Sequence, residues 1–114
     1  MVSRYIPDRG DVVWLDFTPQ SGHEQAGKRP ALVLSPFLYN QKTRLMVCCP
    51  ITSKVKGYPF EVPLPDRFKL SGVILADQLK NLDWFARKVR LLGKVPPIIL
   101  SEVWGKIALL LNPL

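Results

Sequence analysis

The sequence predicts a mainly β domain: a small, barrel-like sheet of short antiparallel strands followed by one C-terminal helix. Short runs of β-branched and aromatic residues alternate with turns that contain glycine or proline, and only the last stretch of the chain changes to helical spacing. The length of 114 residues suits one domain, and no repeat or linker divides it. With 47% hydrophobic residues the chain can build one core, so residues 1–114 are expected to form a single domain.

The strands are predicted from apolar runs bounded by turn residues. Residues 11–17 (DVVWLDF) form such a run between a glycine and a proline. Prolines also flank the run at 31–35 and interrupt the run at 45–51 near its end, which is typical of buried or edge strands. Further strands are predicted at residues 60–64, 73–76 and 87–92, the last of them basic on one face.

The C-terminal segment has the spacing of an amphipathic helix. Apolar residues recur every three or four positions, at Leu100, Val103, Trp104, Ile107, Leu110 and Leu111. Pro97 lies where a first helical turn tolerates proline. The predicted helix covers residues 98–111 and packs against the sheet, which must offset a cost of roughly 1 kcal/mol for Gly105 relative to alanine. One helical turn is also predicted within residues 36–43.

Composition excludes several classes of protein. The longest apolar runs, such as residues 107–111, are far shorter than the roughly 18 to 20 residues of a membrane span. Residues 1–10 lack the apolar core of a secretion signal, so no membrane association and a cytoplasmic location are expected. The only cysteines, Cys48 and Cys49, are adjacent and poorly placed to pair with each other, which excludes a disulfide scaffold and leaves their reactivity open.

No motif for a metal or an organic cofactor is found, so none is expected. His23 is the only histidine, too few for a zinc site of cysteine and histidine ligands. Asp11 and Asp16 are an odd number of positions apart and face opposite sides of a strand, so they are not expected to share a metal. Phosphate-binding and dinucleotide-binding glycine motifs and the Gly-x-Ser-x-Gly elbow do not occur.

Positive charge is concentrated in the middle of the chain. The whole sequence has 16 Lys and Arg against 9 Asp and Glu, with a pI near 9.7. Residues 25–60 contain no acidic residue and six basic ones: Lys28, Arg29, Lys42, Arg44, Lys54 and Lys56. Such a block indicates a polyanionic partner, either a nucleic acid or an acidic protein segment, although a basic surface that only aids solubility gives the same pattern.

The predicted loop at residues 19–28 runs into the densest group of functional side chains. Glu24 lies five residues before Arg29, and a carboxylate at this spacing can accept a proton beside a guanidinium that holds a phosphate. A surface salt bridge, worth under about 1 kcal/mol, is the alternative that spacing alone leaves open.

A second polar group lies at the end of the strand predicted at 45–51. Thr52 and Ser53 are hydroxyl residues at the start of the predicted loop 53–59, which also contains Lys54 and Lys56. Hydroxyls and cations at a strand end suit phosphate oxygens, although a simple turn uses the same residues. A third loop is predicted at 65–71.

Together these segments resemble the MazF/PemK family of toxin endoribonucleases. The likeness is carried in order by residues 10–17, 22–35, 49–53, 56–62 and 72–78 (GDVVWLDF, GHEQAGKRPALVLS, CPITS, KGYPFEV and GVILADQ), and it becomes loose beyond residue 86. The resemblance implies an SH3-like barrel with a terminal helix, of the CcdB/MazF type, that works as a homodimer. It also implies metal-independent cleavage of single-stranded RNA by attack of the 2′-hydroxyl, which leaves 2′,3′-cyclic phosphate and 5′-hydroxyl ends. A cognate antitoxin with an acidic tail is the implied inhibitor.

The resemblance also implies roles for individual residues. Arg29 matches the catalytic arginine that stabilises the phosphorane, Thr52 matches the hydroxyl residue that orients the phosphate, and Glu24 matches the proposed general base. The residues expected to contact substrate are Gln25, Lys28, Ser53, Lys54, Lys56, Asp77 and Gln78. His23 is expected to be a surface residue without a catalytic role. Trp14 and Phe17 are expected to pack in the core or a dimer interface rather than to stack on bases.

Two other functions remain open at this point. CcdB-type toxins share the implied fold but bind DNA gyrase and cleave nothing. A barrel that only binds RNA would have the same basic block. The set of Arg29, Thr52 and Glu24 favours the endoribonuclease, because attack by the substrate's own hydroxyl needs only a base, an electrostatic clamp and correct positioning.

Overall fold

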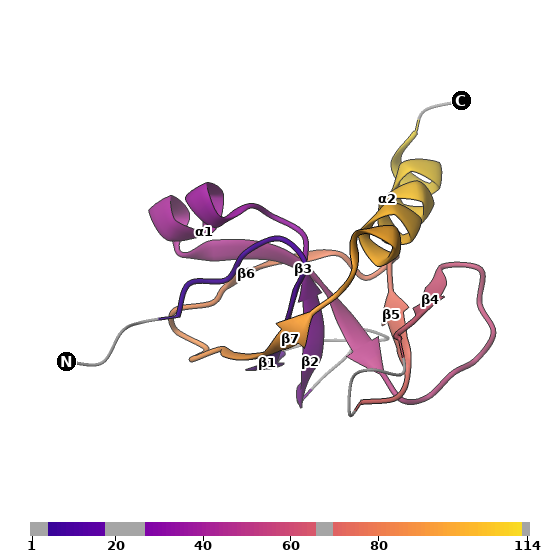
Figure 1. The fold of residues 1–114 in the computed structure, drawn as a ribbon, viewed down its shortest axis with the longest axis horizontal. Helices are drawn as coiled ribbons and strands as arrows, with labels where there is room; N and C mark the ends of the chain where they lie inside the picture. Colours follow the sequence, from indigo (N-terminus) through magenta and orange to yellow (C-terminus); the bar gives the residue numbers. More distant parts are fainter. Residues whose placement is uncertain (1–4, 18–26, 66–69, 113–114) are drawn as a thin grey trace.

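The computed structural model describes residues 5–17, 27–65 and 70–112, which form an antiparallel sheet and two helices (Figure 1). In chain order the elements are β1 (Asp11–Asp16), β2 (Lys28–Val33), α1 (Phe37–Thr43), β3 (Leu45–Thr52), β4 (Glu61–Pro63), β5 (Val73–Leu75), β6 (Lys80–Asp83), β7 (Arg90–Lys94) and α2 (Pro97–Leu111). The prediction of a mainly antiparallel β protein with a C-terminal helix is confirmed.

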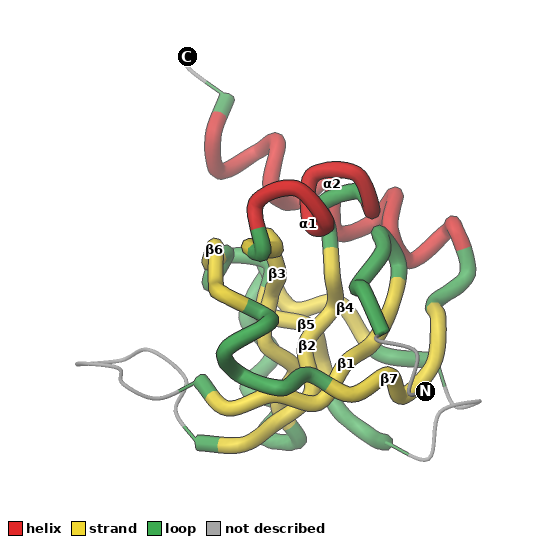
Figure 2. Tube along the Cα trace, turned by 90° about the vertical axis from the view of Figure 1, so that its left-hand side faces the viewer, coloured by secondary structure: helices red, strands yellow, loops and turns green. Residues whose placement is uncertain are grey.

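β3 is the strand around which the sheet is organised. The strand order is β4-β5-β3-β2-β1-β7, and β6 also pairs with β3. One edge of β3 meets β2, whereas the other edge meets β6 along its first half and β5 at its end. The strand path ends at β4 and β7, so this strongly curved sheet is SH3-like without being a closed barrel (Figure 2).

The apolar runs predicted from the sequence bury side chains on both faces of the sheet. Val12 and Leu32 belong to a cluster that includes α2, whereas Val13 and Leu15 belong to a second cluster with Met46 and Trp84. Because both faces of β1 and β2 are covered, their sequences are nearly continuous apolar runs rather than alternating ones.

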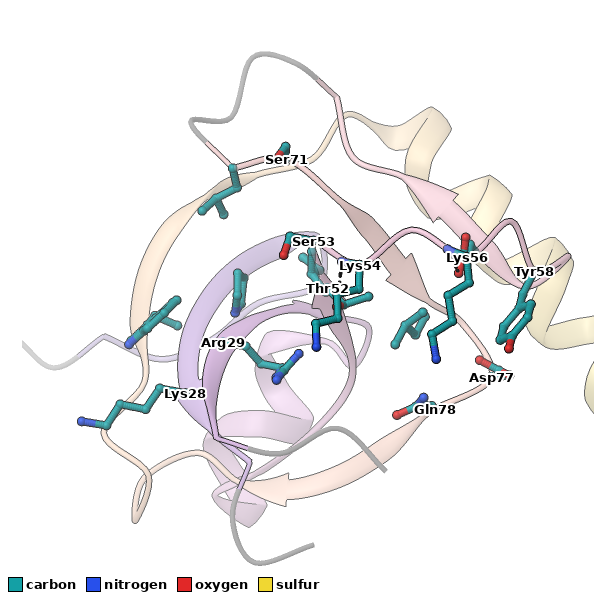
Figure 3. Close-up of a pocket in the computed structure, with 16 residues that line it drawn as sticks. Lys28, Arg29, Thr52, Ser53, Lys54, Lys56, Tyr58, Ser71, Asp77 and Gln78 are labelled. Carbon is teal, nitrogen blue, oxygen red and sulfur yellow. Dashed lines mark hydrogen bonds between the residues drawn. The ribbon is translucent and has the colours of Figure 1, made fainter. Parts of the chain in front are cut away.

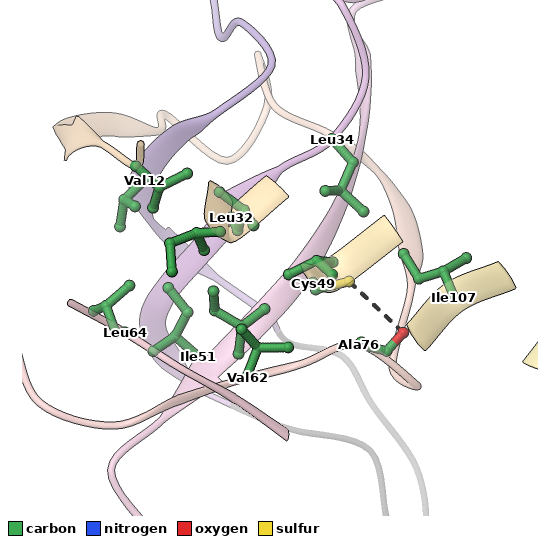
Figure 4. Packing of buried hydrophobic residues seen from close by; sticks show 13 residues of the cluster. Val12, Leu32, Leu34, Cys49, Ile51, Val62, Leu64, Ala76 and Ile107 are labelled. Atoms are coloured by element: carbon green, nitrogen blue, oxygen red, sulfur yellow. Dashed lines mark hydrogen bonds between the residues drawn. The ribbon is translucent and has the colours of Figure 1, made fainter. Parts of the chain in front are cut away.

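Helix α2 covers the first cluster with one side only. Ile99, Val103 and Ile107 are buried against the sheet at intervals of four positions, and Figure 4 shows Ile107 among the core residues. Val103 and Ile107 were predicted on this face, whereas Ile99 was not. Trp104, Leu110 and Leu111, which the spacing also placed on this face, are exposed.

The structure corrects several predicted boundaries. β2 begins at Lys28 rather than at residue 31 and includes Pro30, which pairs with Trp14. The strand predicted at 87–92 is β7 at Arg90–Lys94, because Lys88 has a positive φ of 50° that ends any extended segment before it. The predicted turn at 36–43 is a seven-residue helix. β6 was not predicted, because Lys80–Asp83 (KNLD) lacks an apolar run and is a strand through pairing with β3.

A buried asparagine joins α1 to three other parts of the chain. The side-chain amide of Asn40 donates to the carbonyl oxygens of Pro7 (2.8 Å) and Ser35 (3.0 Å), and its carbonyl oxygen accepts from the Ser35 hydroxyl (2.5 Å). The indole N–H of Trp84 donates to the backbone carbonyl of Asn40 (2.9 Å). These bonds satisfy a polar group that would otherwise be costly to bury.

Asp11 is a structural residue. It is buried and accepts hydrogen bonds from the Tyr5 hydroxyl and, at 3.0 Å, from the backbone N–H of Asp8, and it forms an ion pair with Lys94 (3.0 Å). Burial, together with the hydrogen bond to this carboxylate, raises the pKa of Tyr5 well above its usual value. The carboxylate therefore holds the N-terminal segment and β7 in place.

Both cysteines are buried in the core. Burial raises the pKa of Cys49 to about 12, and it raises the pKa of Cys48 further. Both thiols therefore stay protonated near neutral pH and are weak nucleophiles, which answers the question of their reactivity. Within the described residues, no helix is long and apolar enough to span a membrane.

Gly72 lies against the end of β3. It has a φ of 141°, and a Cβ atom added to it would lie 2.2 Å from the carbonyl oxygen of Thr52. Any larger residue must therefore displace Gly72 or Thr52.

We expect Gly72→Ala to lower the free energy of unfolding by about 1–3 kcal/mol, through backbone strain and overpacking. Gly105→Ala is the control, because Gly105 is in α2 with open space around it and alanine there should raise stability by up to about 1 kcal/mol. Denaturant unfolding measures both. Equal stability of the two variants would contradict the close contact.

Candidate active site

A groove of about 740 Å³ opens where β2 begins and β3 ends, and Figure 3 shows the side chains that line it. These strand ends lie at the end of the sheet away from α1 (Figure 1). β2 and β3 are antiparallel, with Ala31 paired to Pro50 and Leu32 to Cys49. Continued outward by two residues, this register places Arg29 opposite Thr52. The two residues lie 23 positions apart in the sequence, yet both line the groove.

Thr52 is the last residue of β3 and lines the groove. It is buried and pairs with Val73 of β5. Its hydroxyl oxygen accepts a hydrogen bond from the backbone N–H of Lys54 (3.2 Å). Because that bond uses the oxygen as acceptor, the hydroxyl hydrogen can still be donated to an anion in the groove.

Arg29 supplies a guanidinium from a strand rather than from a loop. It is half-buried at the second position of β2, where it pairs with Leu15. A guanidinium is planar and positively charged at neutral pH, so it can donate two hydrogen bonds to two oxygens of one phosphate. Together, Arg29 and Thr52 can hold an anion from two sides.

Further cations extend the positive charge along the groove. Lys54 and Lys56 come from the loop after β3, and their ammonium groups point into the same space as Arg29, whereas Lys28 extends away from them (Figure 3). Like charges gathered in this way attract a polyanion and raise its rate of association.

The carboxylate of Glu61 holds this loop in its conformation through hydrogen bonds. Its two oxygens accept hydrogen bonds from the backbone N–H groups of Lys56 (3.1 Å) and Gly57 (2.9 Å). The positive φ of 79° at Gly57 allows the chain to turn there, and the Lys56 ammonium lies 5.8 Å from the centre of the Tyr58 ring. Glu61 therefore sets the shape of the loop that presents Lys56 and Tyr58.

The opposite wall comes from the segment after β5. Asp77 is exposed and Gln78 is half-buried, in a turn closed by a hydrogen bond from the Gln78 N–H to the Leu75 carbonyl (3.1 Å). Carboxylate and amide groups can bond the edges of unpaired bases.

Most of the predicted site residues therefore lie in one groove. The structure brings together Lys28, Arg29, Thr52, Ser53, Lys54, Lys56, Asp77 and Gln78. Glu24, Gln25 and His23 lie outside the described residues, so their predicted placement and roles stay predictions.

Sequence reasoning missed Trp14, Tyr58, Glu61 and Ser71, which also line the groove. Phe17 is buried as expected, but Trp14 is half-buried in the groove wall and not in the core. Strand alternation alone does not reveal this, because Trp14 is on the same face of β1 as Val12, which is buried in the cluster that includes α2.

Comparison with known proteins gives one consistent group. Residues 8–111 match the family described as PemK-like, MazF-like toxin of type II toxin-antitoxin system. The chain is 52% identical to the endoribonuclease toxin MazF of Escherichia coli K12, over 98% of this chain and all of that protein.

Solved structures show the same relationship. The crystal structure of MazF from Deinococcus radiodurans superposes with a TM-score of 0.93 at 55% identity, covering 96% of this chain and all of the other. MazF in a MazE–MazF structure from the same organism has a TM-score of 0.85 at 50% identity, covering 96% and 98% of the two chains.

We expect Glu61→Gln to loosen the loop, because a neutral amide has one acceptor oxygen in place of two. Backbone amide hydrogen exchange at Lys56 or Gly57 should become faster by up to about tenfold, the effect of losing one charge-assisted hydrogen bond. Glu102→Gln, on the exposed side of α2, is the matched control and should leave both amides unchanged. Unchanged exchange at both amides in Glu61→Gln would show that the carboxylate does not hold the loop.

Proposed function

The chain belongs to the PemK-like, MazF-like toxin family of type II toxin-antitoxin systems, and from this premise we propose that it is an endoribonuclease that cleaves single-stranded RNA at a short sequence. One observation carries the proposal. Arg29, near the start of β2, and Thr52, at the end of β3, line the same groove, which is also lined with further cations. The Escherichia coli relative, which this chain matches over the relative's full length, is named an endoribonuclease toxin.

The proposed reaction uses a nucleophile that the substrate provides. The ribose 2′-oxygen forms a bond to the adjacent phosphorus, and the bond from phosphorus to the 5′-oxygen of the next nucleotide breaks. The 2′-hydroxyl proton passes to a general base, for which Glu24 is our candidate, and the leaving 5′-oxygen takes a proton, for which Arg29 is the candidate donor. The products are a 2′,3′-cyclic phosphate and a 5′-hydroxyl.

Arg29 and Thr52 act on the phosphate. Negative charge on the non-bridging oxygens grows as the phosphorane forms, and a fixed guanidinium stabilises that charge without having to reorganise. Thr52, fixed by its bond to Lys54, orients the phosphate so that the 2′-oxygen and the leaving oxygen lie in line. DNA lacks the 2′-hydroxyl and should bind without being cleaved.

The proposal includes three partners and a location. RNA occupies the groove, a cognate acidic antitoxin competes for the same cations, and a second copy of the chain forms a homodimer. A MazE–MazF structure is known for the Deinococcus relative. Because messenger RNA is the proposed substrate, we place the protein in the cytoplasm.

A gyrase-binding function of the CcdB type is not favoured. Such a toxin needs no catalytic residues, whereas here the strand register brings an arginine and a threonine together in a cationic groove.

The proposal is tested by incubating the purified full chain, in excess EDTA, with a long single-stranded RNA and with DNA of the same sequence. We expect cleavage of the RNA alone, at one short repeated motif, with cyclic phosphate ends. Arg29→Ala and Thr52→Ala should each lower the rate by about 100-fold or more, the usual effect of removing a donor that stabilises a transition state. Arg90→Ala, an exposed arginine of β7 outside the groove, is the control.

Intact RNA after incubation with folded, antitoxin-free protein would contradict the endoribonuclease and make gyrase inhibition the next assay. Full activity of Arg29→Ala would show that the reaction takes place in another part of the molecule.

A further inference from the structure

We propose that a second hollow beside the groove binds a nucleotide that flanks the cleavage site. The inference rests on the proposed function and extends it, since it names where the RNA continues beyond the scissile phosphate. The hollow has a volume of about 390 Å³ and is walled by the end of β1, the start of β2 and residues 86–88. Volumes from about 300 Å³ upward are typical of sites for small organic ligands.

The two hollows are neighbours. Trp14 and Lys28 line both of them, so a strand that leaves the groove past Trp14 enters the second hollow directly. The Trp14 side chain is half-buried, and its indole gives an aromatic surface on which an unpaired base can stack.

Arg87 is fixed in the wall of this hollow. Its Nε donates to the carbonyl oxygen of Asp16 (3.0 Å) and its Nη1 donates to that of Asp83 (3.4 Å). These bonds use two of the five N–H groups of the guanidinium, and among the described residues Nη2 has no hydrogen-bond partner. An arginine held in this way can receive a phosphate without losing further side-chain freedom.

Lys88 adds a second cation next to Arg87. It is exposed and has a φ of 50°, in a turn closed by a hydrogen bond from its N–H to the Phe85 carbonyl (3.3 Å). With Lys28, the hollow has three cations and one carboxylate, Asp16, which lies opposite Lys28 in the β1–β2 register. Positive charge beside an aromatic ring matches a nucleotide, which has both a phosphate and a base.

The test compares two synthetic RNAs after the cleavage motif has been mapped. One contains the motif alone, and the other adds three nucleotides on each side. Wild-type protein should have the higher kcat/KM on the longer RNA. Arg87→Gln and Lys88→Gln should each lower the ratio of the two kcat/KM values by about tenfold, as for loss of one charge-assisted hydrogen bond. Each should also reduce the slope of log affinity against log salt for the longer RNA by about 0.7, the value for one phosphate contact on a single strand.

Arg90→Gln is the matched control, because it removes one charge from an exposed residue outside both hollows and should leave the ratio unchanged. Lys88→Gln keeps the test valid if Arg87→Gln unfolds, since no side-chain bond of Lys88 is found among the described residues. An unchanged ratio in folded Arg87→Gln and Lys88→Gln overturns the second hollow while cleavage persists. Absence of cleavage of either RNA by wild-type protein contradicts the proposed function instead.

Discussion

The antiparallel register between β2 and β3 is the constraint on which the site depends. Because β2 and β3 are antiparallel and Ala31 pairs with Pro50, the start of β2 and the end of β3 lie at the same end of the sheet. A shift of one residue would turn Arg29 or Thr52 to the other face, because side chains alternate along a strand. The register is fixed by burial on both faces, since Leu32 and Val33 of β2 belong to different core clusters. The hydrophobic core thus determines where the guanidinium and the hydroxyl lie.

Positive charges are concentrated in the groove, and they repel one another in the folded protein. Arg29, Lys54 and Lys56 point into one space, and their mutual repulsion is relieved when an anion binds there (Figure 3). The carboxylate of Glu61 lies at the same groove, but its oxygens are committed to the backbone of the lysine-bearing loop. The negative charge therefore shapes the loop without filling the place of the substrate.

The sequence predicts the parts of the fold that follow from burial and the part of the site that lies at strand ends. β1, β3 and α2 were predictable because their apolar residues are continuous or periodic. β6 was not, because its polar residues take strand conformation only through pairing with β3. Spacing alone left Arg29 open to a surface salt bridge, and only the resemblance to a toxin family implied the catalytic role that we propose for it. Glu61 and Arg87 could not be found from sequence, since each acts through backbone groups that only the folded chain brings near.

The most direct measurement is a crystal structure of the protein with a single-stranded RNA that has the mapped motif and a 2′-deoxy nucleotide at the cleavage position, which prevents the reaction. The account predicts that the scissile phosphate lies within about 2.7–3.2 Å of both the Arg29 guanidinium and the Thr52 hydroxyl oxygen. A phosphate held elsewhere in the protein, in contact with neither residue, would contradict the central claim that the register of β2 and β3 builds the active site.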